Sequence, residues 1–268
     1  MNAREPYPSD LTNDQWSVIE DLVPKPKPGG RPATYDRRAI VNGLLYVTRT
    51  GCQWRALPHD LPPWRIVYWY FMAWRDDGTF ERVHDRLRSA VRHKAGRDIQ
   101  PTAAVLDSQS VKTTEAGGPK GYDSGKKVKG RKRHLLVDTL GLILSVAVLP
   151  ADVQDRDGAK TVLESLKAPF CWVKKVWADG ASAGQWVEWV AGLRSRRPVE
   201  LAIVPRSEEA VGFEVIAKRW IVERTLGWLN RCRRLSKDYE ATLRSAVAMI
   251  RLAMIHVMVR RLAPVTAF

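Results

Sequence analysis

The sequence predicts an α/β fold, in which helices flank a mixed β-sheet, preceded by a small all-α amino-terminal domain. Up to about residue 98 the apolar side chains recur at helical spacing, whereas short strand-like runs begin after residue 102. Two of these runs, 131–138 and 142–150, are joined only by the turn "TLG", which indicates an antiparallel hairpin. Helical segments alternate with the later strands, and this alternation favours a mixed sheet covered by helices.

The amino-terminal part contains its own helix signals. Thr12 and Gln15 have the spacing of a capping box in front of a short amphipathic helix. The stretch "PKPKPGGRP" (24–32) then predicts a linker. Further helices are expected at about 35–49, 63–76 and 79–95. We interpret this part as a compact DNA-binding domain with helix-turn-helix character; the alternative is a helical bundle that only packs against the rest.

The second part, residues 99–268, changes to mixed strand and helix patterns. Strands are expected at 103–107, 131–138, 142–150, 173–179 and 200–205. Helices are expected at 158–167, 183–193, about 208–234 and about 240–262. The sequence therefore predicts two domains, 1–98 and 99–268.

The charge of the chain points to an anionic partner. Lys and Arg number 44 and Asp and Glu 29, which gives a formal net charge of +15 and a pI near 10.0. Such an excess repels itself and usually serves nucleic-acid binding. Three scattered cysteines and five scattered histidines predict neither a zinc site nor disulfides, and the longest apolar run (246–259) is too short to cross a bilayer. We expect a reduced, cytoplasmic protein.

Two predicted strands end in aspartate. "AAVLD" ends at Asp107 and is followed by polar residues, and "VWAD" ends at Asp179 and is followed by the small residues "GASAG". Ligands of α/β folds collect at the carboxyl ends of strands. Each aspartate alone is also explained by turn formation, so the pair is the stronger signal.

A third carboxylate lies in the basic stretch "RWIVERTLGWLNRCRRL" (219–235). On a helix, Glu223 falls on the face opposite the apolar stripe, together with Arg219, Asn230 and Arg234. The alternative is a solvated face with ordinary Arg–Glu pairs. Three carboxylates on separate elements suit Mg²⁺, which binds few carboxylates and leaves positions for phosphate oxygens. Two such ions support in-line displacement at phosphorus.

The blocks "LDSQSVK", "WADGASAG" and "RWIVERTLGWLNRCRRL" resemble the three signature blocks of bacterial insertion-sequence transposases of the DDE class, in the branch of families four and five. The opening "LTNDQWSVIEDLVP…GGRP…GLLYVTRTGCQWRALP" resembles the amino-terminal domain of that branch. The resemblance implies a ribonuclease-H-like core whose metal ligands are Asp107, Asp179 and Glu223. They would hold two Mg²⁺ ions, for which Mn²⁺ can substitute. Arg219 matches the signature arginine, whereas the lysine often found seven residues after the glutamate is Asn230 here.

The resemblance also implies an activity and a partner. The protein is expected to cleave the ends of its own element and to join them to target DNA. Its partners are then double-stranded DNA, both terminal inverted repeats and target, and a second copy of the chain, as a homodimer or higher oligomer when two ends are synapsed. We expect a bacterial cytoplasmic protein, at the nucleoid when bound to DNA, with no membrane partner. Between Asp179 and Glu223 we expect no inserted domain.

Two other functions stay open. A structure-selective, metal-dependent nuclease would use the same carboxylates but never join strands. A non-catalytic DNA-binding repressor derived from a transposase would need only the basic surface.

The Gly-rich segment 117–134 lacks the residue spacing of a phosphate-binding P-loop. Its cations, and those near Glu223, are instead expected to contact DNA phosphates; a solvated flexible loop is the alternative. The predicted DNA contacts are Lys126, Lys127, Lys129, Arg131, Lys132, Arg133, Arg219, Asn230, Arg231 and Arg234. The aspartates of "ADVQDRDGAK" (151–160) are expected to be structural, and His134 and His256 to be packed or surface residues.

Overall fold

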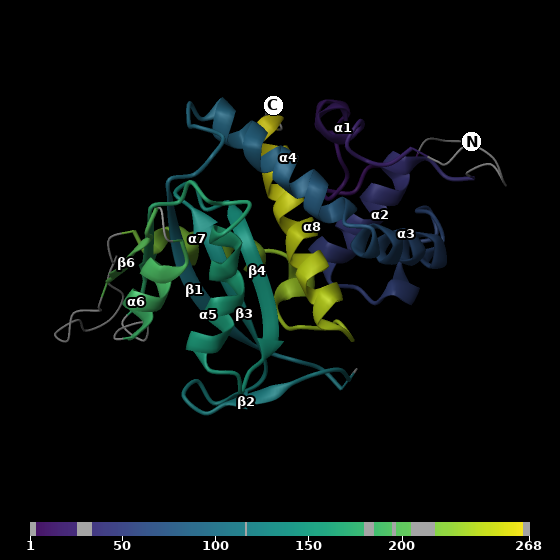
Figure 1. Ribbon diagram of the computed structural model, residues 1–268. Coiled ribbons are helices and arrows are strands. Elements are labelled where there is room, and N and C mark those ends of the chain that lie inside the picture. Colours follow the sequence, from purple (N-terminus) through teal and green to yellow (C-terminus); the bar gives the residue numbers. More distant parts are fainter. Residues whose placement is uncertain are drawn as a thin grey trace. The chain divides into compact units, whose positions relative to one another are not determined.

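The computed structural model describes residues 4–25, 34–115, 117–179, 185–194, 197–204 and 218–264 (Figure 1). The chain forms two compact units. Unit 1 contains the residues up to Ala95, residues 229–239 and the residues from Arg244 onward, and unit 2 contains residues 96–228 and 240–243. The first division lies close to the expected boundary, but the carboxy-terminal segments group with the amino-terminal helices. Most of the expected linker 24–32 lies outside the described residues.

Unit 1 is helical. Its helices are α1 (Asn13–Ile19), α2 (Arg37–Thr50), α3 (Trp64–Asp76), α4 (Thr79–Lys94) and α8 (Leu243–Leu262). The capping box of α1 is confirmed, since the Thr12 hydroxyl accepts from the Gln15 amide at 3.2 Å and the Gln15 side chain accepts from the Thr12 amide at 3.2 Å. The predicted helices of the amino-terminal part are thus present.

Helix α8 forms the interior of unit 1. It is apolar on nearly all sides, which is typical of a buried helix, and Met249, Ile250 and Met258 are completely buried. The Thr48 hydroxyl of α2 lies 3.3 Å from the sulfur of Met249. Lys94, at the end of α4, donates to the carbonyl oxygen of Leu262 at 2.7 Å. The amino-terminal helices therefore build their core with a segment from the other end of the chain.

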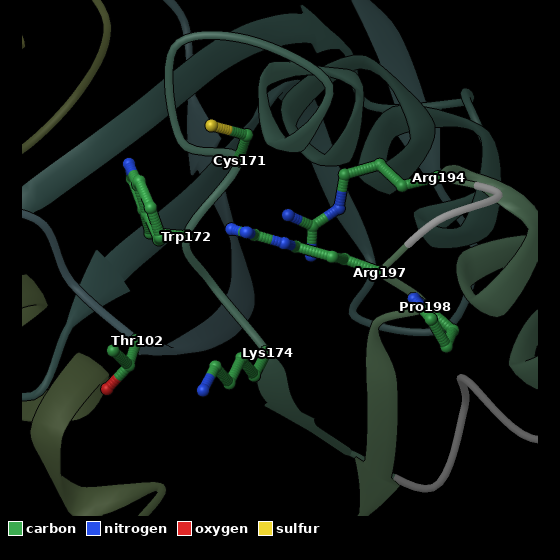
Figure 2. Close-up of a pocket in the computed structure, with 7 residues that line it drawn as sticks. All are labelled: Thr102, Cys171, Trp172, Lys174, Arg194, Arg197 and Pro198. Carbon is green, nitrogen blue, oxygen red and sulfur yellow. The ribbon is translucent and has the colours of Figure 1, made fainter.

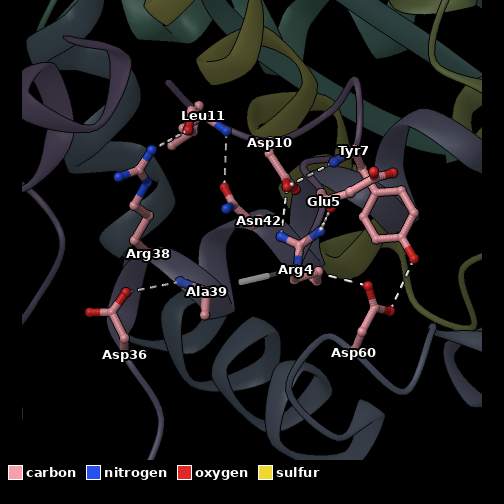
Figure 3. Close-up of polar contacts among 10 residues, drawn as sticks. All are labelled: Arg4, Glu5, Tyr7, Asp10, Leu11, Asp36, Arg38, Ala39, Asn42 and Asp60. Carbon is pink, nitrogen blue, oxygen red and sulfur yellow. Dashed lines mark hydrogen bonds and ion pairs between the residues drawn. The ribbon is translucent and has the colours of Figure 1, made fainter. Parts of the chain in front are cut away.

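The first residues of unit 1 are fastened to α2 by polar contacts (Figure 3). Asp10 accepts from the Arg4 guanidinium at 2.6 Å and from the Tyr7 amide at 3.0 Å. The buried side chain of Asn42 accepts from the Leu11 amide at 3.0 Å. Two of these bonds satisfy the backbone amides of Tyr7 and Leu11, which lie outside the helices.

Unit 2 contains one six-stranded mixed sheet. Its strands are β1 (Ala103–Lys112), β2 (Gly121–Asp123), β3 (Val128–Asp138), β4 (Ile143–Pro150), β5 (Lys175–Ala178) and β6 (Glu200–Ile203). The order is β2-β3-β1-β5-β6, and β4 pairs with β3. The predicted hairpin of β3 and β4 is confirmed as antiparallel, while β1, β5 and β6 run parallel. The sequence did not predict β2, which has only three residues.

Unit 2 contains the helices α5 (Asp155–Leu163) and α6 (Gln185–Gly192) and all but the last two residues of α7 (Trp220–Asn230). One face of the sheet packs against α5 and α6. On β1, Ala104 and Leu106 belong to the same buried cluster as Val162 of α5 and Val190 of α6. Side chains alternate along a strand, so Asp107, which follows Leu106, points to the opposite face of the sheet.

The long helix expected at 208–234 is wrong in its extent. Helix α7 ends at Asn230, and a 3-10 turn follows at Arg233–Leu235. The backbone leaves helical geometry at Cys232, with φ −92° and ψ 107°. No glycine or proline marks this break, so the apolar spacing alone suggested a continuous helix. Residues 205–217 lie outside the described part of the chain.

Candidate active site

Asp107 and Asp179 come together because β1 and β5 are parallel neighbours. The register pairs Val105 with Trp177. Continued by two residues, it places Asp107 beside Asp179, which directly follows β5. Residues at matching positions of adjacent parallel strands point to the same face, so the sheet presents two carboxylates side by side. The expectation that the first strand ends at Asp107 is wrong, because β1 stays paired with β3 as far as Lys112, so that Asp107 lies in the middle of β1 and only Asp179 follows the end of its strand.

The surroundings of Asp107 disfavour its negative charge. The pKa of this carboxyl is raised to about 6, first by burial and also by the Asp179 charge. A hydrogen bond from the Ser108 amide at 2.7 Å and the charges of Arg219 and Lys126 act in the opposite direction. Two carboxylates that repel each other in a partly buried position form a set of hard oxygen donors suited to a divalent cation.

Helix α7 is fixed to the turn between β3 and β4. The Thr225 hydroxyl donates to the Gly141 carbonyl oxygen at 2.8 Å, and a Cβ on Gly141 would lie 2.7 Å from that hydroxyl. Gly141 also has a positive φ of 78°. The Arg224 guanidinium donates to the Leu140 carbonyl oxygen at 3.1 Å and lies over the ring of Trp228. Together these contacts position the helix that carries Glu223.

Glu223 is half-buried on α7, one turn after Arg219. Arg219 lies near enough to Asp107 to lower the pKa of that carboxyl, and its buried Nε has no hydrogen-bond partner in the described part of the chain. Within the described residues, no three His, Cys, Asp or Glu side chains gather closely enough to hold a metal ion. The structure thus brings Asp107 and Asp179 together with Arg219, but does not gather Glu223 with them into a three-carboxylate cluster.

Three exposed lysines follow β2: Lys126, Lys127 and Lys129, which we call the lysine loop. Lys126 lies close enough to affect the pKa of Asp107. Lys127 and Lys129 line an open pocket of about 350 Å³, together with Lys112, Thr113, Thr114, Glu115, Lys120 and Tyr122. This surface is basic and carries an exposed aromatic ring.

Three of the predicted DNA contacts are buried instead, and this part of the prediction is corrected. Arg131 is completely buried and donates to the carbonyl oxygens of Pro119 and Glu240, each at 2.8 Å. Lys132 is buried between Asp123 at 3.5 Å and Asp155 at 3.2 Å. Arg133 is 1% exposed. Cations enclosed by the protein and its own acceptors cannot neutralise phosphates of DNA.

The predicted DNA contacts after Glu223 also include both buried and exposed residues. Arg234 is buried, lies over the rings of Trp54 and Tyr239 and donates to the Cys52 carbonyl oxygen, so its prediction as a DNA contact is also corrected. Asn230 and Arg231 are exposed.

Other expectations concern polar residues outside the site. Asp155 is structural as expected, since it accepts from the Ser108 hydroxyl at 3.0 Å and pairs with Lys132. His134 and His256 are packed, and burial lowers the pKa of each to about 4.

The strand order and the position of the two aspartates define the class of the protein. A central strand carries the first aspartate, its parallel neighbour ends at the second, and an antiparallel hairpin lies beyond. This is a ribonuclease-H-like α/β fold, in which a mixed sheet is flanked by helices.

The chain belongs to the family of transposases with a DDE domain, because the family model "Transposase DDE domain" matches residues 98–258. The model "Putative transposase of IS4/5 family" matches residues 11–84. These matches show an insertion-sequence transposase of the DDE class, as the sequence motifs predicted.

Two relatives are similar over part of the chain. The "Insertion element IS402 uncharacterized 16.2 kDa protein" of Burkholderia cepacia is 31% identical over 115 residues, which cover 40% of this chain and 76% of that protein. "Uncharacterized protein y4sN" of Sinorhizobium fredii (strain NBRC 101917 / NGR234) is 28% identical over 109 residues, 32% of this chain and 87% of that protein. No solved structure matches the chain. In the described ranges, none of the helices has both the length and the apolar character to span a membrane.

Sequence reasoning missed one group of polar residues altogether. Trp172, Lys174, Arg194 and Arg197 line a pocket at the opposite end of the sheet from Asp107. The stretches "CWVKK" and "LRSRRP" could have indicated this pocket. The first has two lysines near a tryptophan, and the second has several arginines before a proline.

Proposed function

We propose that this transposase is a metal-dependent enzyme that cleaves the ends of its element and transfers them to target DNA. The observation that carries the proposal is the parallel register that sets Asp107 beside Asp179, in a chain that belongs to the DDE transposases. In this proposal Glu223 completes the set of carboxylates, because its helix begins directly after Arg219, the cation near Asp107.

The donor set fits Mg²⁺ or Mn²⁺. Asp107, Asp179 and Glu223 offer only oxygen atoms, and the raised pKa of Asp107 reflects a negative charge that burial and Asp179 leave poorly compensated. When bound, two such ions supply activation of the attacking water or hydroxyl and stabilisation of the leaving oxygen.

The remaining residues bind and orient DNA. Arg219 would hold a phosphate oxygen beside the carboxylates, since its Nε has no hydrogen-bond partner among the residues that the structure describes. The lysine loop would neutralise backbone phosphates next to the scissile one, and Arg231 and Asn230 offer exposed donors after α7. Gly227, one turn after Glu223, leaves open space on the helix surface, since a Cβ added there would meet no atom within 4 Å.

The amino-terminal helices would recognise the ends of the element. Their residues 11–84 match the IS4/5 transposase model, and exposed Arg and Gln side chains on helices can contact base edges in a major groove. Exposed Arg55 and Arg65 are suitable positions. Their replacement by Gln should reduce the preference for end duplex over random duplex; an unchanged preference would place recognition elsewhere.

One active site holds one scissile phosphate, whereas an element has two ends. We therefore propose that at least two copies of the chain act on a synapsed pair of ends. Sizing of the complex on end DNA tests this, and a single copy that bridges two ends would contradict it.

A strand-transfer assay tests the proposed function. The full chain, an oligonucleotide duplex that carries the element end, a target plasmid and Mg²⁺ should give cleaved ends joined to the plasmid. Cleavage without joining would indicate the nuclease, and binding without cleavage would indicate the repressor.

A further inference from the structure

A second cationic pocket lies at the end of the sheet where β1, β5 and β6 begin. Thr102 directly precedes β1, Lys174 directly precedes β5, and Pro198 lies two residues before β6. The pocket has a volume of about 520 Å³. Asp179 lies five positions after Lys174, which corresponds to roughly 17 Å along an extended strand. This pocket is therefore separate from the candidate active site.

The pocket concentrates positive charge. Lys174, Arg194 and Arg197 line it, and none of its described lining residues is acidic. The Arg194 guanidinium donates to the Val173 carbonyl oxygen, but its Nε and Nη1 are buried and have no hydrogen-bond partner among the described residues. Buried donors without an acceptor are costly, and a guanidinium presents them in a geometry that matches a phosphate group.

The pocket also offers an exposed aromatic ring. Trp172 is 45% exposed, although large apolar side chains are usually covered. Figure 2 shows the Arg197 side chain directed at Trp172, and its guanidinium carbon lies 4.8 Å from the ring centroid. An indole with an arginine beside it is the combination on which bases of single-stranded nucleic acids stack.

We propose that this pocket binds a nucleotide unit of single-stranded DNA, with a phosphate on Arg194, Arg197 and Lys174 and its base stacked on Trp172. Phosphate alone would explain the cations but not the exposed indole. A duplex would explain the cations, but its bases are stacked on one another and cannot stack on Trp172. The unpaired strand explains both features.

The proposal does not depend on the proposed chemistry, because binding is measured with EDTA present. The full chain and a fluorescent 12-nucleotide single strand are titrated, with a duplex of the same sequence in parallel. Trp172→Leu should weaken single-strand binding about tenfold, since stacking of one base is typically worth that much or more. Trp172→Phe keeps a ring and should retain most of the affinity.

Arg197→Gln should also weaken single-strand binding and should make its log–log salt dependence shallower by about 0.7, the value for one phosphate contact of a single strand. Trp172→Leu should leave this slope unchanged. The matched control is Lys167→Gln, which removes an exposed charge that pairs with Glu164 on the same unit. It should leave single-strand affinity unchanged.

Three results would overturn the proposal. The first is wild-type affinity of both Trp172→Leu and Arg197→Gln for the single strand. The second is an equal loss for single strand and duplex, which would indicate only a general charge effect. The third is displacement of the oligonucleotide by AMP or inorganic phosphate at equal phosphate concentration, which would identify a free small ligand instead.

Discussion

The two ends of the sheet in unit 2 carry opposite kinds of charge. Where β5 ends, Asp179 lies beside Asp107 of β1, and burial and the second carboxylate raise the pKa of the first. Where the same strands begin, Arg194 and Arg197 line one pocket, and burial lowers the pKa of Arg194. Each end therefore holds a charged group in surroundings that disfavour its charge.

The two ends differ in which charged groups accompany each other. The carboxylates have cations nearby, Arg219 and Lys126, so in the proposed function this end would hold both a metal ion and a phosphate. The pocket at the other end has cations and an indole but no acidic residue among its described lining, so it suits a phosphate and a base without metal. In our proposals, one strand pair thus separates a site for chemistry from a site for binding alone.

The largest effect should follow from the loss of any one carboxylate. Asp107→Ala, Asp179→Ala and Glu223→Ala should each lower the rate of end cleavage in Mg²⁺ by roughly 10³-fold or more, because the metal ions lose a ligand at the reacting phosphate. Affinity for end DNA in EDTA should stay near wild type. Gel-based cleavage and binding assays measure both.

Asp157→Ala is the control for this series, since Asp157 is an exposed carboxylate of α5 that pairs with Lys160. It should cleave like wild type. Near-normal cleavage by any one of the three site variants would remove that residue from the proposed set, and for Glu223 it would leave a two-carboxylate site.

A smaller effect is expected from the lysine loop. Replacement of Lys126, Lys127 and Lys129 together by Gln should make the log–log salt dependence of duplex binding shallower by about 0.9 for each phosphate that is no longer neutralised. The preference for end duplex over random duplex should not change. Lys160→Gln with Lys167→Gln is the control, because both lysines pair with acidic neighbours on an exposed surface. A changed preference with an unchanged slope would mean that the loop contacts bases.

The smallest effect concerns stability at the carboxylate end. The pKa of Asp107 is about 6 in the folded protein and 3.8 as the ordinary value, so the folded state holds its proton more tightly. The stability contributed by this proton is present below about pH 4 and is lost as pH rises through about 6. Without metal at pH 7.5, Asp107→Asn should therefore raise the free energy of unfolding by about 1–2 kcal/mol, a value reduced for partial exposure.

Urea denaturation in EDTA measures this change, with Asp157→Asn as the control. As pH rises from 4 to 6, the free energy of unfolding of the wild type should fall because Asp107 loses its proton, and Asp107→Asn should not show this part of the fall. If Asp107→Asn is less stable than wild type, neighbouring cations and hydrogen bonds stabilise the Asp107 charge in the folded state. The two ends of the sheet would then not both hold a charge in unfavourable surroundings.

Much of the fold could be predicted because local patterns are strong. Apolar spacing predicted α2, α3 and α4, the capping residue Thr12 predicted the start of α1, and the turn at Gly141 predicted the hairpin. The end of α7 could not be predicted, since the residues at 231 and 232 are compatible with a helix and only the packed turn at Arg233–Leu235 ends it.

The candidate site was predictable in its residue types but not in its burial. Asp107 and Asp179 each follow an apolar run, which predicted a strand end at both; this holds for Asp179 but not for Asp107, because β1 continues to Lys112. The alternation of cations in "KKVKGRKRH" gave no sign that Arg131 and Arg133 point into the protein while Lys127 and Lys129 remain exposed. Burial of a long cation depends on acceptors from distant segments, such as the Glu240 carbonyl oxygen that binds Arg131.

The sequence by itself determined the charge of the chain, five of the six described strands and the carboxylates that follow two apolar runs, because these depend on composition and on neighbours along the chain. Tertiary structure decided which strands are parallel neighbours, and with that the pairing of Asp107 with Asp179. It also decided that α8 forms its core with the amino-terminal helices and that Trp172, Arg194 and Arg197 share a pocket. Contacts between segments far apart in the chain are fixed by the burial of complementary surfaces, which no local pattern records.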